Sequence, residues 1–108
     1  MDFKKLAENL GLETDEYAEL VELFVDTGKP QVVDLRDAVK AENREGIRKI
    51  AHSLKGASGN LGLMEISHVS KKIEDDCVSL NFRAVAESIE KINELIDALS
   101  AASQSSLA

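Results

Sequence analysis

The sequence contains few of the features that characterise secreted or membrane-spanning proteins. It has one cysteine, one proline and no tryptophan among its 108 residues. A single cysteine cannot form an internal disulfide, which excludes a disulfide-stabilised secreted fold. The apolar runs are only a few residues long and the N-terminus is amphipathic, so neither a membrane-spanning helix nor a secretory signal is expected. These absences predict a cytoplasmic protein with one small domain, spanning residues 1–108.

The lone cysteine, Cys77, is predicted to be a buried packing residue. Asp75 and Asp76 precede it and disfavour the thiolate that a redox sensor would need. Cys77 also shares the helical register of nearby apolar residues, which are Ile66, Val69, Ile73 and Leu80.

Basic residues are in the minority. The chain has 13 lysines and arginines against 20 aspartates and glutamates, a formal net charge of -7. A nucleic-acid-binding protein is expected to present a basic face to phosphates, so this class is disfavoured. The balance reverses in one stretch, whose charged residues are Arg44, Glu45, Arg48, Lys49 and Lys55. This stretch is either an ordinary solvated helix face or a basic surface that guides an acidic partner.

Motifs for metal and nucleotide chemistry are missing. No cluster of Cys or His has the spacing of metal ligands, and there is no Gly-x-x-x-x-Gly-Lys-Ser/Thr loop. We therefore predict no metal, no bound cofactor and no kinase activity in this chain. One of the two histidines, His68, lies off the apolar register between Glu65 and Lys72 and is predicted to be solvated.

Helical periodicity, in contrast, is present along the whole chain. In the last segment apolar residues recur three and four positions apart without interruption, at Phe82, Val85, Ile89, Ile92, Ile96 and Leu99. An earlier segment has similar spacing at Tyr17, Leu20, Phe24, Val32, Leu35 and Val39. We predict an all-α fold, an antiparallel up-down four-helix bundle with a short extra N-terminal helix.

Capping and breaking residues predict where the helices begin and end. A short helix over 3–10 stops at Gly11, and Thr14 caps a second helix that runs to about residue 42. Asn43 caps the next, which runs to about residue 60, and Gly62 turns the chain into a helix over 63–80. Asn81 caps the last helix.

Two segments are harder to assign. Gly28 and Pro30 must kink the second helix or split it, and we favour a kink because the apolar register continues across them. Residues 101–108, rich in serine and alanine, are predicted to be a flexible tail.

The stretch from 51 to 62 carries the clearest functional signal. At about 100° per residue on a helix, His52, Lys55, Gly56 and Gly59 share one stripe that faces away from the apolar side. Glycine in a helix interior costs about 1 kcal/mol relative to alanine, so two such glycines beside one histidine indicate a functional requirement.

These residue types suit phosphoryl chemistry. A neutral imidazole carries a nitrogen lone pair near pH 7, so His52 can attack phosphorus without a general base. Lys55, three residues on, can offset the negative charge of phosphoryl oxygens. Gly56, which has no side chain, leaves room around the ring for a phosphoryl group and a docking partner.

The motif His52-Ser-Leu-Lys55-Gly56-Ala-Ser-Gly59-Asn-Leu-Gly62 closely resembles the signature of histidine-containing phosphotransfer (HPt) domains. The resemblance implies that His52 accepts a phosphoryl group from an aspartyl phosphate on one receiver domain and passes it to the aspartate of another. It also implies partners, namely response-regulator receiver domains and an upstream hybrid sensor kinase, with the magnesium ion on the receiver. Lys55 and Gly56 match the residues that support the histidine, and we take Arg48, Lys49 and Gly59 as candidate partner contacts.

A carboxylate on the following helix is predicted to reach His52. His52 lies ten residues before Gly62 and Glu74 twelve after it, about 15 and 18 Å from the turn at 1.5 Å per residue. Glu74 is therefore level with the ring and can accept a hydrogen bond from the nitrogen that is not phosphorylated. In HPt domains this position often carries glutamine or a similar polar residue. A simple helix salt bridge, or support from Ser70 or Lys71 instead, stays open.

Three functions fit these observations. The leading hypothesis is a monomeric phosphocarrier in two-component signalling. The alternative is a non-catalytic helical adaptor that binds receiver-like partners through the same face. A kinase dimerisation domain also places a histidine on a helical bundle, but this chain by itself already supplies four core helices.

Overall fold

The structure, a computed structural model, describes residues 2–107, with side chains through Ser105. It contains five helices: α1 (Phe3–Asn9), α2 (Thr14–Lys40), α3 (Arg44–Asn60), α4 (Met64–Val78) and α5 (Phe82–Leu107). No strand occurs in the described part of the chain, which confirms the predicted all-α class. None of these helices combines the length and the apolarity needed to cross a membrane.

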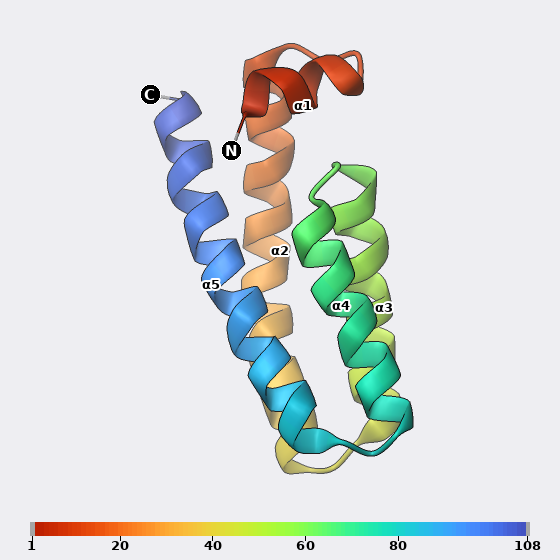
Figure 1. Ribbon diagram of the computed structural model, residues 1–108. Helices are drawn as coiled ribbons and strands as arrows, with labels where there is room; N and C mark the ends of the chain where they lie inside the picture. Colours follow the sequence, from red (N-terminus) through yellow and green to blue (C-terminus); the bar gives the residue numbers. More distant parts are fainter. Residues whose placement is uncertain (1, 108) are drawn as a thin grey trace.

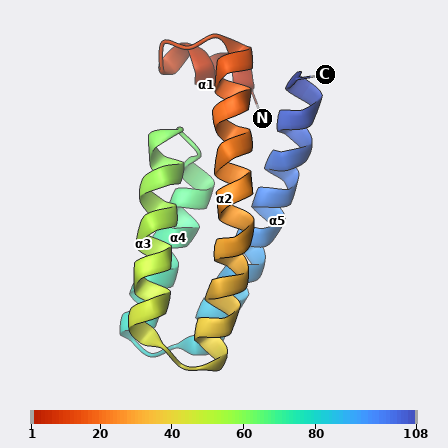
Figure 2. The same ribbon diagram turned by 180° about the vertical axis from the view of Figure 1, so that it is seen from behind.

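The four long helices run up and down in chain order, as Figures 1 and 2 show. α2 packs along α5, and α3 forms a shorter hairpin with α4; these are the two most extensive helix pairs. The short α1 lies across the end of the bundle where α2 begins, beside the turn between α3 and α4. The whole molecule is elongated, at 41 × 21 × 17 Å. The predicted four-helix bundle with an extra N-terminal helix is therefore confirmed.

Helix ends follow the predicted caps with one exception. The side chain of Asn43 accepts the amide of Gly46 at 3.0 Å, and Asn81 Oδ1 accepts the amide of Ala84 at 3.2 Å. Thr14, predicted as the N-cap of α2, is instead the first helical residue. Glu13 is the N-cap instead, and its amide donates to the carboxylate of Glu16 at 2.9 Å.

α2 is one continuous helix through Gly28 and Pro30. The predicted alternative of a split is therefore wrong. The apolar side chains before and after this segment, Phe24 and Val32, are both buried in the same core, which keeps the two halves in register. Gly28 is buried as well, and a Cβ there would lie 3.2 Å from Cδ1 of Ile96 on α5. The glycine thus permits close approach of the two longest helices.

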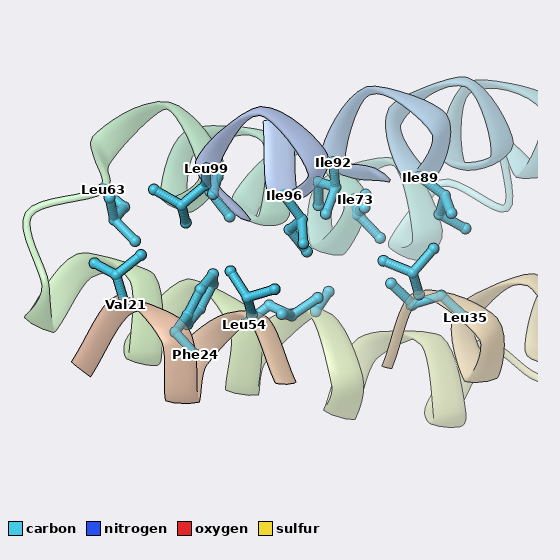
Figure 3. Close-up of a cluster of buried hydrophobic side chains, with 14 of the residues drawn as sticks. Val21, Phe24, Leu35, Leu54, Leu63, Ile73, Ile89, Ile92, Ile96 and Leu99 are labelled. Atoms are coloured by element: carbon cyan, nitrogen blue, oxygen red, sulfur yellow. The ribbon is translucent and has the colours of Figure 1, made fainter. Parts of the chain in front are cut away.

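The core lies between the four long helices. Figure 3 shows Val21, Phe24 and Leu35 from α2 opposite Ile89, Ile92, Ile96 and Leu99 from α5, with Leu54 and Ile73 in the same cluster. Cys77 belongs to this core, as predicted, and burial raises the pKa of its thiol.

Two apolar residues predicted to face the core do not. Leu80 is 58% exposed and adopts a φ of 59°, because α4 ends at Val78 and the chain turns there toward α5. Leu20 is 39% exposed, because it lies at the edge of the buried stripe of α2.

The predicted flexible tail is also corrected. α5 continues to Leu107, and the buried hydroxyl of Ser103 donates to the carbonyl of Ala18 at 3.0 Å. Ala102 packs against the core. This segment is helical because it packs against another part of the chain. The first turns of α2, which begins at Thr14, need a partner, and the small side chains at the end of α5 let it approach closely enough. Residue 108 lies outside the described residues.

Candidate functional site

The site is built on the middle of α3. This helix buries Ile47, Ala51, Leu54 and Ser58 against the bundle, so the opposite stripe faces solvent. His52 lies on that stripe, and 68% of its side chain is exposed. An imidazole in this position is open to a second protein.

The turn at Gly62 brings α4 alongside α3 and places Glu74 beside His52. Gly62 has a φ of 74°, a left-handed conformation that glycine adopts without strain. Oε2 of Glu74 lies 3.5 Å from Nδ1 of His52, and Oε1 lies 2.9 Å from Nζ of Lys55. The Glu74 side chain is only 18% exposed. One carboxylate therefore contacts both the histidine and the lysine of the motif.

The two competitors for this supporting position are occupied elsewhere. Ser70 is buried and donates to the carbonyl of Ile66 at 2.8 Å. Lys71 forms an ion pair with Asp75 on its own helix at 3.2 Å. Of the three candidates, Glu74 is the one that contacts His52.

The two glycines of the motif have different surroundings. Gly56 is exposed, and a Cβ added there would meet no described atom within 4 Å. Packing inside this chain therefore does not require glycine at 56. Gly59 is half-buried, and its Cβ would lie 3.5 Å from Oγ of Ser67 on α4. Gly59 faces the neighbouring helix as well as solvent, so it is less available to a partner than the stripe predicted.

The basic stretch is less positive in three dimensions than in sequence. Arg48 makes two hydrogen bonds to Glu45, and this pairing lowers the pKa of Glu45. Lys55 is paired with Glu74. This acid comes from α4 and is therefore not part of the basic stretch. Lys49 is exposed and forms no ion pair with the side chains that the structure describes. The hydrogen bond with Glu45 is the main cause of the raised pKa of the Arg48 guanidinium, and the charge of Glu74 on α4 adds to it.

Sequence analysis missed an open groove between α2 and α3. Gln31 donates to Oγ of Ser53, the residue next to His52, at 3.4 Å. Leu23 is 63% exposed at the groove's edge. The sequence signal that could have indicated this groove is Leu23, an apolar residue of α2 that lies outside the helix's buried register. The groove measures about 340 Å³ and is lined by Leu20, Leu23, Phe24, Thr27, Gln31, Ser53, Ala57, Asn60 and Leu61.

The comparison with protein families agrees with this geometry. The family model described as Hpt domain matches residues 19–104, which is most of the chain. The chain belongs to the Hpt domain family. The match begins within α2 and ends within α5, so it covers the bundle and the motif but leaves out α1. Comparison with curated proteins and with solved structures found no match.

Membership supplies the general function. Hpt domains are phosphocarrier modules that take part in histidine phosphotransfer within phosphorelays, and they interact with receiver domains of two-component systems. Among the described residues of this Hpt domain, no group of three or more His, Cys, Asp or Glu side chains is arranged to hold a metal ion.

Proposed function

We propose that this Hpt domain is a phosphorelay intermediate that accepts a phosphoryl group on Nε2 of His52 from the aspartyl phosphate of one receiver domain. It then passes the group to the aspartate of another receiver. The observation that carries this proposal is the pairing of an exposed imidazole with a carboxylate that faces only one of its two nitrogens, Nδ1.

The contact with Glu74 supports Nε2 as the nitrogen that reacts. A carboxylate 3.5 Å from Nδ1 favours the tautomer that carries its hydrogen on Nδ1. Nε2 then keeps its lone pair and attacks phosphorus. The N–P bond forms as the bond between phosphorus and the aspartyl oxygen breaks, and the bonding electrons leave with the aspartate carboxylate.

The neighbouring residues support this step in different ways. Lys55, which contacts the same carboxylate as His52, offsets charge on the phosphoryl oxygens. Gly56 leaves space above the helix for the partner, which explains a glycine that internal packing does not need. Arg48 and Lys49, exposed one turn before His52, favour approach of an acidic receiver surface.

The remaining requirements lie with the partners. The receiver supplies the reactive aspartate and its magnesium ion, and an upstream hybrid sensor kinase supplies the phosphoryl group. We propose that this chain acts in the cytoplasm as a monomer, without kinase activity of its own, because one exposed histidine face serves one receiver at a time.

The decisive experiment is phosphoryl transfer from a panel of radiolabelled phospho-receiver domains to the wild-type chain and to His52→Gln. We expect acid-labile, alkali-stable label on the wild type and none on the variant, with equal helicity for both. If no receiver labels the folded wild type while some still bind it, the domain is a non-catalytic adaptor and the proposal is wrong.

A further inference from the structure

Glu74 and Lys55 form an ion pair between α4 and α3 in the unphosphorylated site. The Lys55 ammonium lies 2.9 Å from Oε1 of Glu74 in the unphosphorylated site. That oxygen is buried and accepts no hydrogen bond from the described residues, so the ion pair is its main compensation. Lys55 is thus already engaged before any phosphoryl group arrives.

Phosphorylation changes the charges around this carboxylate. When an imidazole that keeps its hydrogen on Nδ1 attacks through Nε2, the ring becomes a phosphoimidazolium with one positive charge. The phosphoryl group attached to it carries about two negative charges. A cation therefore appears 3.5 Å from Oε2 of Glu74, and a dianion appears on the other side of the ring.

We infer that phosphorylation of His52 exchanges the counterion of Glu74: the carboxylate pairs with the phosphoimidazolium ring, and Lys55 moves to the phosphoryl oxygens. This inference rests on the proposed phosphorylation of His52 and adds a device to it. Lys55 becomes a ligand of the phosphoryl group only when the ring is charged.

The exchange fits the cost of separating charges. If Lys55 left an uncharged ring, Glu74 would keep a carboxylate that is 18% exposed without a counterion, which is unfavourable. Once the ring is charged, Glu74 stays paired when Lys55 departs. Lys55 has the reach for this movement, because it lies one turn after His52 on the same face and its side chain leans toward the helix N-terminus.

A carboxylate is required for this exchange. Glutamine at 74 could still accept the Nδ1 hydrogen, but it carries no charge to hold Lys55 or to stabilise the phosphoimidazolium. Glu74→Gln should therefore release Lys55 in the unphosphorylated protein and leave the phosphoimidazolium without a carboxylate counterion in the phosphorylated one.

The test is NMR of the lysine ammonium groups in the wild type and in Glu74→Gln, before and after phosphorylation with phosphoramidate. Lys55→Gln assigns the signal. We expect the Lys55 signals of the two proteins to differ before phosphorylation and to coincide after it, because both ammoniums then face phosphate. Signals that still differ after phosphorylation would show that Lys55 remains with Glu74, and would overturn the inference.

A second readout is the lifetime of the phosphohistidine. Protonated imidazole is the better leaving group, so Glu74→Gln should slow hydrolysis of the N–P bond about fivefold, the difference between a charged and a neutral hydrogen-bond acceptor. Asp75→Asn is the matched control, since it removes the neighbouring ion pair with Lys71 and should leave the rate unchanged. Equal rates for Glu74→Gln and the wild type would contradict the exchange.

The outcomes separate this inference from the proposed function. Phosphoramidate needs no partner, so convergence of the Lys55 signals without labelling by any receiver would support the exchange and refute the relay. Labelling by receivers without convergence of the Lys55 signals would support the relay and refute the exchange. If phosphoramidate leaves His52 of the folded wild type unmodified, the exposed nucleophile on which both depend is refuted.

Discussion

Two histidines in this chain are each followed, three residues later, by a lysine, yet the structure treats them differently. His52 and Lys55 lie on α3 and both contact Glu74, which comes from α4. His68 lies exposed on α4, and its lysine, Lys71, pairs with Asp75 of the same helix. His68 has no hydrogen bond or ion pair among the described residues.

The position that follows each lysine differs too. His52 has Gly56 one turn later, where an added Cβ would meet nothing, whereas His68 has Lys72, which pairs with Asp76. A histidine and a lysine at helical spacing are therefore not a site by themselves. A carboxylate from a second helix and an open surface distinguish the candidate site from a solvated histidine.

The largest expected effect comes from replacing each histidine in turn. In a complete relay from one receiver to a second, His52→Gln should reduce onward transfer to background, because no nucleophile is left. His68→Gln should match the wild type. The measurement is the radiolabel on the second receiver over time; loss of transfer in His68→Gln would undo the distinction between the two regions.

The second largest effect is expected when the surroundings of His68 are copied to His52. Gly56→Lys places a long side chain beside the ring, as Lys72 stands beside His68, and should slow transfer from a receiver about 100-fold by displacing the partner. The free energy of unfolding, measured in urea, should not fall, because position 56 is open. A transfer rate equal to that of the wild type would show that Gly56 does not serve docking.

The glycines can be compared by alanine substitution. Gly56→Ala should raise the free energy of unfolding by about 1 kcal/mol through helix propensity. For Gly28→Ala, the change in the free energy of unfolding should be at least about 1 kcal/mol less favourable than for Gly56→Ala. The reason is that its Cβ would lie 3.2 Å from Cδ1 of Ile96 in the core.

The matched background for this comparison is Ile96→Val, which removes that Cδ1 atom. In the Ile96→Val background, the difference in free energy of unfolding between Gly56→Ala and Gly28→Ala should become smaller. A gap that does not change would mean that the close approach of α2 and α5 is not what glycine at 28 provides.

The two lysine ion pairs should differ in strength. A double-mutant cycle with Lys55→Gln and Glu74→Gln should give a coupling free energy of about 1 kcal/mol, because Glu74 is largely buried. The cycle for Lys71 and Asp75, whose side chains are 62% and 66% exposed, should give about 0.3–0.5 kcal/mol. Equal values from urea unfolding would contradict the idea that the cross-helix carboxylate is special.

The smallest effect concerns Arg48, which is paired within its own helix. The hydrogen bond from Arg48 lowers the pKa of Glu45, so this pair stabilises the fold above the unfolded pKa of the carboxyl group and is lost as pH falls through the folded one. Arg48→Gln should raise the pKa of Glu45 toward its ordinary value, as followed by NMR titration. An unchanged pKa of Glu45 would contradict the pairing of Arg48 with Glu45.

Most of the fold could be predicted because its signals are local. Asn43 and Asn81 cap helices through their own side chains, and Gly62 turns the chain through its own backbone. The errors occurred where a distant partner decides. Residues 101–105 have no apolar face of their own, and they are ordered as a helix because Ser103 reaches α2. Leu20 has the right spacing, but the edge of the bundle leaves it exposed.

The candidate site divides in the same way. Sequence periodicity alone determined that His52 faces solvent with Lys55 and Gly56, because these residues belong to one helix whose opposite face is apolar. It also made Glu74 level with His52. Only the tertiary structure decided that Glu74 contacts both His52 and Lys55, that Ser70 and Lys71 do not compete, and that Gly59 faces α4. The physical reason is that a helix repeat sets direction within one helix, whereas the packing of two helices sets which side chains meet.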